Sequence, residues 1–97
     1  MIDTKHLQAL AAVITEQSFE KAARSLFLTQ SAVSQRIRQL EEHIGQMLVV
    51  RSVPIRPTSA GMAMLRHFRQ LSVLEESLFE ELAPGENSTT ADRKSVV

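Results

Sequence analysis

Apolar residues in the first part of the chain recur every three or four residues, which is the spacing of one face of an α-helix. The first such run predicts a helix over residues 4–16, because Asp3 can cap its N-terminus. The apolar stripe of this helix consists of Leu7, Leu10, Ala11 and Ile14. Ser18 can cap a second, short helix. The buried face of that helix would consist of Phe19, Ala22, Ala23 and Leu26.

A third helix is predicted from Gln30 to Ile44. Thr29 can cap its start, and Gly45 can end it because the residue after a helix commonly adopts the left-handed conformation. The joint with the second helix is tight and spans only residues 27–29, without a glycine. Two helices that follow each other so closely indicate a helix-turn-helix.

A short β-type segment follows the third helix. Residues 47–51 (MLVVR) predict one strand, and a second short strand could lie near residues 55–57. Pro57 would restrict that second strand to pairing at a sheet edge. With the tight loop over residues 53–57, these segments predict a β-wing of minimal size.

A final helix is predicted to begin after Thr58 or Ser59, either of which can cap it, and to end at Leu82 before Pro84-Gly85. At 1.5 Å per residue its length would be roughly 36 Å. Its apolar positions recur at threes and fours and are Leu65, Phe68, Leu71, Leu74, Leu78 and Leu82. A domain this small cannot cover so long a stripe, so we expect these residues to form a homodimer interface. The alternatives are that the helix folds back onto its own domain as a lid, or that a C-terminal domain of the longer protein covers it.

The predicted fold is therefore mainly α. Residues 1–58 would form a winged helix-turn-helix, with a three-helix core and a short β-wing, and residues 59–82 a long linker and dimerisation helix. Residues 83–97 are polar and predict a flexible linker, at which the chain is expected to have been cut from a longer protein.

The third helix has the chemistry of a DNA-reading element. At 100° per residue, Val33, Ile37, Leu40 and Ile44 face one side, whereas Ser31, Ser34, Gln35 and Arg38 lie on the other. Glutamine can pair with adenine, serine can contact several base edges, and arginine can contact guanine or phosphate. The predicted DNA-binding residues are Thr29, Gln30, Ser31, Ser34, Gln35, Arg36, Arg38, Arg51 and Arg56. The alternative for any single polar residue is a solvated helix face.

Arg51 and Arg56 flank the wing, where they could contact phosphates or the minor groove. An equally weighted alternative is a structural ion pair of these arginines with Glu41 or Glu42. The charge distribution favours a polyanionic partner, although the 97-residue chain has no net charge. Residues 1–74 carry nine basic and five acidic residues, a net charge of +4, and residues 75–97 carry −4.

Several other classes of function find no support in the sequence. The chain has no cysteine, which excludes disulfides and thiolate metal sites and is compatible with a cytoplasmic location. His6, His43 and His67 lack metal-ligand spacing, so no metal or other cofactor is expected in this part of the protein. No catalytic constellation is present, and no apolar run is long enough to cross a membrane.

Several motifs together resemble the LysR-type transcriptional regulators. They are AARSL (residues 22–26), TQSAVSQRIRQLE (29–41), Gly45, Leu48, Arg51 and TSAG (58–61), within a resemblance that covers roughly residues 4–82. The resemblance implies a winged helix-turn-helix, a dimerising linker helix and a C-terminal effector-binding domain that this chain lacks. Residues 34–37 (SQRI) and 51–58 (RSVPIRPT) are similar to the ArgP/LysG branch. That branch implies control of basic amino-acid export genes and a basic amino-acid effector bound by the absent domain.

This chain departs from most of the family at two DNA-facing places. Gln35 and Arg36 stand in the reverse of the usual order, and the wing is one residue shorter and has one arginine fewer than is usual in the family. The base contacts that the family resemblance implies are therefore expected most clearly at Gln30, Ser31 and Ser34. The alternative function is a winged-helix module for protein interaction and dimerisation through the leucine-rich helix, favoured by the acidic far end and the overall neutrality of the chain. An enzyme is the third and weakest hypothesis.

Overall fold

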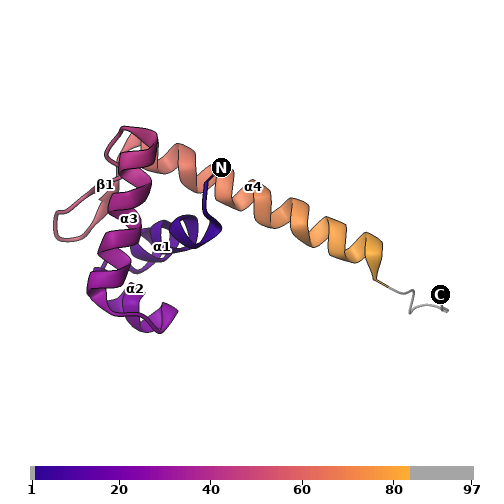
Figure 1. The fold of residues 1–97 in the computed structure, drawn as a ribbon, viewed down its shortest axis with the longest axis horizontal. Coiled ribbons are helices and arrows are strands. Elements are labelled where there is room, and N and C mark those ends of the chain that lie inside the picture. The colour runs from indigo at the N-terminus through magenta and orange to yellow at the C-terminus, as the bar shows by residue number, and fades with distance from the viewer. Residues whose placement is uncertain (1, 84–97) are drawn as a thin grey trace.

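The helix boundaries follow the capping residues of the sequence. A computed structural model of the chain describes residues 2–83 and shows four helices and two short strands in that range (Figure 1). These are α1 (Thr4–Glu16), α2 (Phe19–Leu26), α3 (Gln30–Ile44), β1 (Val49–Val50), β2 (Arg56–Pro57) and α4 (Ser59–Leu82). Each helix begins after a side chain that accepts a backbone N–H bond, and these caps are Asp3, Ser18, Thr29 and Thr58. The helices predicted over residues 4–16 and 30–44 are confirmed, as is the predicted end of α4.

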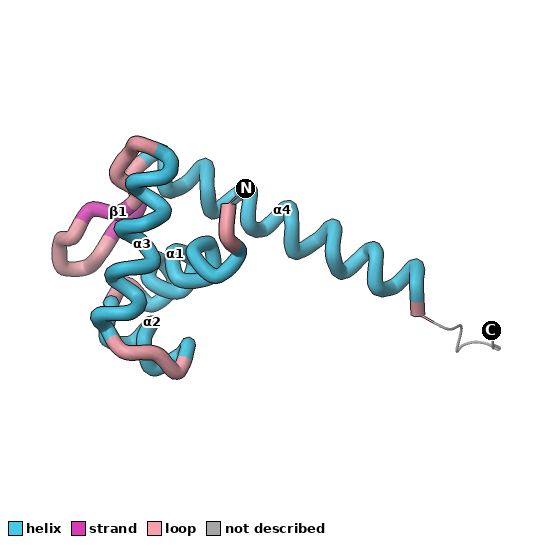
Figure 2. The backbone as a smooth tube through the Cα atoms, viewed as in Figure 1, coloured by secondary structure: helices cyan, strands magenta, loops and turns pink. Residues whose placement is uncertain are grey.

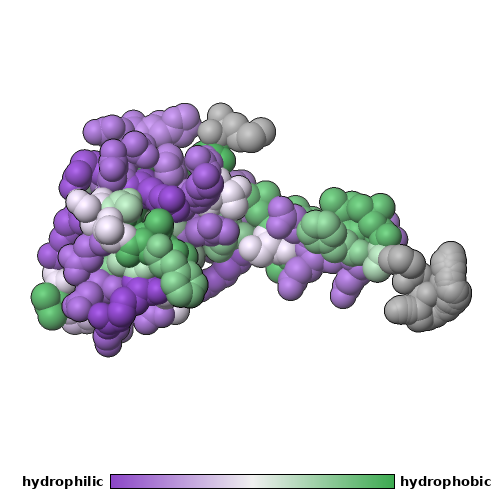
Figure 3. Space-filling model, turned by 60° about the horizontal axis from the view of Figure 1, so that its bottom comes forward, coloured by the Kyte–Doolittle hydropathy of each residue, from purple (hydrophilic) through white to green (hydrophobic). Residues whose placement is uncertain are grey.

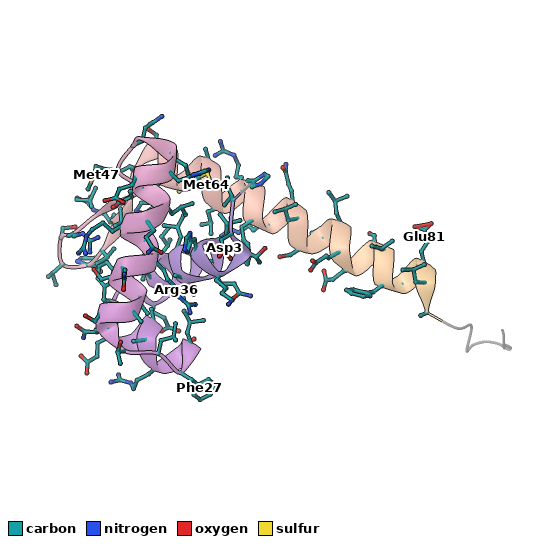
Figure 4. All side chains as sticks on the ribbon, in the orientation of Figure 1. Asp3, Phe27, Arg36, Met47, Met64 and Glu81 are labelled. Atoms are coloured by element: carbon teal, nitrogen blue, oxygen red, sulfur yellow. The ribbon has the colours of Figure 1, made fainter. Side chains whose placement is uncertain are left out.

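Left-handed residues end the first three helices. The φ angles are +56° at Gln17, +58° at Phe27 and +81° at Gly45. Of these three residues only Gly45 is a glycine, the residue type that adopts the left-handed conformation without strain. Phe27 takes the place of glycine in the α2–α3 joint and is 95% exposed, projecting from the end of the domain (Figure 4). The tight joint predicted from the sequence is thus present.

The core lies where α1, α2 and α3 meet, and the connection to the wing closes it. Its buried residues are Leu7, Ala9, Leu10, Val13, Ala22, Ala23, Val33, Ile37, Leu40, Leu48, Val49 and Ile55. The prediction for α1 was partly wrong, because Ala9 and Val13 are buried whereas Ala11 is only half-buried. The physical reason is that α1 packs against three helices, α2, α3 and α4, so its buried face is broader than one stripe. Phe19 and Leu26 of α2 are half-buried at the edge of this core.

The β-wing is shorter than predicted. Only Val49 and Val50 pair with β2, in an antiparallel register that sets Val49 opposite Pro57 and Val50 opposite Arg56. Met47, Leu48 and Arg51 of the predicted segment 47–51 therefore lie outside the strand. The two strands form a small ribbon at one side of α3 (Figure 2). Pro57 has no N–H to donate to a neighbouring strand. This is tolerated because β2 has only one neighbour and is therefore an edge strand.

Hydrogen bonds fasten α4 to the base of the wing. The Thr58 hydroxyl donates to the Met47 carbonyl at 2.6 Å, and the Thr58 N–H donates to the Leu48 carbonyl at 3.0 Å. Gly61 lies in the next turn, so close to Leu48 that a Cβ atom there would overlap the Leu48 carbonyl oxygen. Beyond this joint α4 projects as a long arm (Figure 1), and the radius of gyration is 17.5 Å, against about 13 Å for a rounded domain of this length. The linker predicted over residues 83–97 lies, apart from Ala83, outside the described residues.

Candidate nucleic-acid interface

One side of α3 is apolar and buried, and the opposite side is polar and open. Val33, Ile37 and Leu40 have at most 1% of their surface exposed. Ser31, Gln35 and Arg38 lie on the exposed side, as the periodicity predicted. Arg38 Nη2 donates to Ser34 Oγ at 3.2 Å, so Ser34 still has its hydroxyl hydrogen to donate elsewhere.

A shallow hollow at the start of α3 gathers most of the predicted site. It is lined by Phe19, Thr29, Gln30, Ser31, Ser34 and Arg51. The Thr29 hydroxyl accepts from the Ala32 N–H at 3.0 Å, so this side chain serves as the helix cap at the edge of the hollow. The fold therefore brings Arg51 from the wing to the first turn of α3, a proximity that sequence spacing does not reveal.

The other predicted residues are not among those that line this hollow. Gln35 is exposed one residue beyond Ser34, and Arg56 is exposed on β2 of the wing. Arg36 is half-buried. It is two residues from Ser34 and therefore about 200° away around the helix, which places the two side chains on opposite flanks of α3. The structure thus groups Ser34 with Arg51 and separates both from Arg36.

Arg51 forms an ion pair with Glu41 rather than with Glu42. Its Nη2 lies 4.0 Å from Glu41 Oε1, and its Cζ lies 4.7 Å from the centre of the Phe19 ring. Glu41 is buried, although no burial was predicted at this position from the sequence. The available signal was the spacing of four residues from Ile37, which places Glu41 at the edge of the apolar face.

The predicted dimer stripe on α4 divides into a covered and an open part. Leu65 is only 6% exposed, and Phe68 is half-buried against the core of its own domain. The open part consists of Leu71, Leu74, Leu78 and Leu82, with exposures between 40% and 69%. Val73 and Phe79, which the sequence analysis did not single out, are also exposed. Figure 3 shows apolar side chains gathered over the far part of the α4 arm.

The open stripe continues into a groove between α4 and the N-terminal segment. The apolar residues lining this groove are Ile2, Leu7, Phe68, Leu71, Leu74 and Leu78. Within residues 2–83, no three side chains of ligating type are grouped closely enough to hold a metal ion. No helix in the same range is long and apolar enough to cross a membrane.

A tight α2–α3 joint, a polar outer face on α3 and an antiparallel wing define a winged helix-turn-helix protein. The chain belongs to the lysR family of bacterial regulatory helix-turn-helix proteins, whose family model matches residues 4–62. The family and the winged-helix fold predicted from the motifs are thereby confirmed. The members of this family are transcription regulators, not enzymes.

Similar proteins include regulators of the ArgP type. The chain is 49% identical over 85 residues to the HTH-type transcriptional regulator ArgP of Aeromonas salmonicida, covering 88% of this chain and 28% of that protein. The crystal structure of ArgP from Mycobacterium tuberculosis is similar at a TM-score of 0.80 and 46% identity, over 87% of this chain and 32% of that one. The crystal structure of BenM_DBD in complex with catB site 1 DNA has a TM-score of 0.76 and 32% identity, over 82% and 91% of the two chains. The chain thus spans less than a third of the length of its ArgP relatives.

Proposed function

We propose that the chain is a sequence-specific DNA-binding domain of an ArgP-like transcription regulator. The observation that carries this proposal is the exposed Gln and Ser face of α3, with Arg51 beside its first turn. This set of side chains matches the donors and acceptors of base edges and the negative charge of phosphates. The similarity to the BenM domain, which was crystallised with DNA, supports the same function.

In this proposal α3 lies in the major groove of duplex DNA. Gln30, Ser31, Ser34 and Gln35 contact base edges, and Thr29 lies at the end of the helix that approaches the backbone. Arg36, Arg38, Arg51 and Arg56 neutralise phosphates, with Arg56 reaching from the wing toward the adjacent minor groove. The phosphate contacts would supply affinity, and the base contacts would supply specificity.

The experiment is a titration of a labelled duplex with the chain across a series of salt concentrations. We expect affinity to fall steeply with salt, because each neutralised phosphate contributes about −0.9 to the slope of log K against log salt. The matched duplex selected from random sequences should bind more tightly than a scrambled one. No duplex binding at low salt would refute the function and favour the protein-interaction alternative.

The open leucine stripe supports a second part of the proposal, a homodimer through α4. The basic residues Arg66 and Arg69 lie in the first half of α4, and its acidic residues, Glu75, Glu76, Glu80 and Glu81, lie in the second half. Antiparallel pairing of two copies near Leu74 would set the basic half of each helix opposite the acidic half of the other. A two-fold dimer of this kind presents two α3 helices to two half-sites.

Sedimentation of the chain and of two variants tests the dimer. Leu71→Glu combined with Leu78→Glu places charges in the stripe and should yield a monomer that still binds a single half-site weakly. Val73→Glu is the control, because Val73 is also exposed, at 60%, but lies about 200° from Leu71 around the helix. A wild-type chain that remains monomeric at high concentration with DNA present would refute this part.

For the whole protein we propose the role implied by the ArgP resemblance. It would act in the cytoplasm and control export genes for basic amino acids, with a basic amino acid as the effector of a C-terminal domain. Genome-wide selection of fragments bound by this domain would test the choice of genes. Recovery of fragments unrelated to amino-acid export would contradict it.

A further inference from the structure

Glu41 is the only charged side chain that is buried among residues 2–83, with 7% of its surface exposed. Its Oε2 accepts a hydrogen bond from the Leu48 N–H at 2.9 Å, in a buried position. A neutral amide oxygen could accept the same bond, and burial of a carboxylate is unfavourable unless the charge is paired. The hydrogen bond to Leu48 therefore does not explain why this position carries a charge.

The partner of that charge is Arg51, which is constrained from two directions. Glu41 Oε1 lies 4.0 Å from its Nη2, and the face of Phe19 lies 4.7 Å from its Cζ. The Arg51 side chain nevertheless retains 38% of its exposure, and it lines the hollow that contains Gln30 and Ser31.

The length of the ion pair matters for what Arg51 can still bind. A separation of 4.0 Å is longer than a direct charge-assisted hydrogen bond, so Glu41 attracts the guanidinium without occupying its N–H groups. A guanidinium has five such donors in a rigid planar fork, a shape suited to a phosphate. Arg51 is therefore held in place with donors still available beside the first turn of α3.

We propose that Glu41 is a positioning residue that, together with the Phe19 ring, orients Arg51 for contact with a DNA phosphate. The proposal rests on the proposed DNA-binding function and assigns Glu41 a role although it touches no DNA. An arginine that is already ordered loses less conformational freedom on binding than a free one. The opposing expectation is purely electrostatic, because removal of any carboxylate near the interface should strengthen binding to a polyanion.

Two matched variants separate these expectations. Glu41→Gln keeps an oxygen for the Leu48 N–H and removes the charge, whereas Glu42→Gln makes the same change at the neighbouring exposed residue. The probe is a mixed-sequence DNA duplex, since a phosphate contact does not depend on sequence. We expect Glu42→Gln to bind as tightly as the wild type or more tightly. Glu41→Gln should bind about two- to tenfold more weakly, which is the effect of freeing one flexible side chain.

A coupling measurement distinguishes positioning from simple stabilisation. Arg51→Ala should flatten the salt slope by about one, and Glu41→Gln should cause no further weakening in that background. The NMR relaxation of the Arg51 Nε–H group should show faster motion in Glu41→Gln than in the wild type. If Glu41→Gln does not fold, Phe19→Leu replaces it, with the same weakening expected and the same dependence on Arg51.

Two results would overturn the proposal while the proposed function stands. One is equal binding by Glu41→Gln and Glu42→Gln, and the other is weakening that persists in the Arg51→Ala background. Failure of the wild-type chain to bind any duplex would instead refute the proposed function, and the positioning role with it.

Discussion

Replacement of Gly61 by alanine tests the joint between α4 and the wing. On helix propensity alone this substitution should stabilise α4 by about 1 kcal/mol. The structure predicts the opposite sign, because the new Cβ would overlap the Leu48 carbonyl oxygen and lie 3.0 Å from the carbonyl carbon. Both are backbone atoms, so relief requires movement of α4 or of the segment before β1.

The magnitude follows from what that movement disturbs. Overpacking of a well-packed site costs about 1–3 kcal/mol. The two hydrogen bonds from Thr58 to Met47 and Leu48 would also be lost, at about 1 kcal/mol each. After the gain in propensity is subtracted, we expect the free energy of unfolding to fall by about 2–4 kcal/mol.

Urea unfolding followed by circular dichroism measures this change, at one fixed protein concentration because dimerisation affects stability by mass action. With a dependence on urea of about 1–3 kcal/mol/M, the midpoint should fall by about 0.7–4 M. Ala63→Gly, at an exposed position in the same helix, is the control and should lose only about 1 kcal/mol from propensity. A Gly61→Ala chain as stable as the wild type would show that α4 is not fixed against Leu48 and would refute this prediction.

Three further substitutions test separate statements about the site and the fold. Gln35→Ala should relax the base preference at one position of each half-site by about 1–3 kcal/mol, and an unchanged motif in a selection experiment would contradict the assignment. Arg56→Ala should instead weaken binding to every duplex alike and flatten the salt slope by about 0.9, so a sequence-dependent loss would argue against a phosphate contact. Phe27→Asn should raise the free energy of unfolding by about 0.5–1 kcal/mol, because Phe27 is 95% exposed at a φ of +58° that asparagine adopts more readily. Urea unfolding measures that gain, and a loss of stability would show that the Phe27 ring contributes to the fold.

The sequence by itself determined the helices of this protein and the face of α3 that is buried. Capping residues and periodic apolar residues act over one or two turns, so Thr29, Gly45 and the spacing from Val33 to Leu40 were enough to place α3. The motifs around this helix also identified the family, because they sit at fixed positions within one continuous segment. These features depend on residues that are close in the sequence, so the sequence alone is enough to predict them.

The tertiary structure decided how the wing and α4 meet the three-helix core. Glu41 is buried because the chain turns back after Gly45 and brings the Leu48 N–H to its carboxylate, an event that local periodicity does not encode. The same return places Arg51 beside Phe19, and the packing of α4 leaves Leu65 buried and Leu71 open. Burial and pairing at these positions depend on segments far apart in the sequence, and only their packing in three dimensions fixes which of them meet.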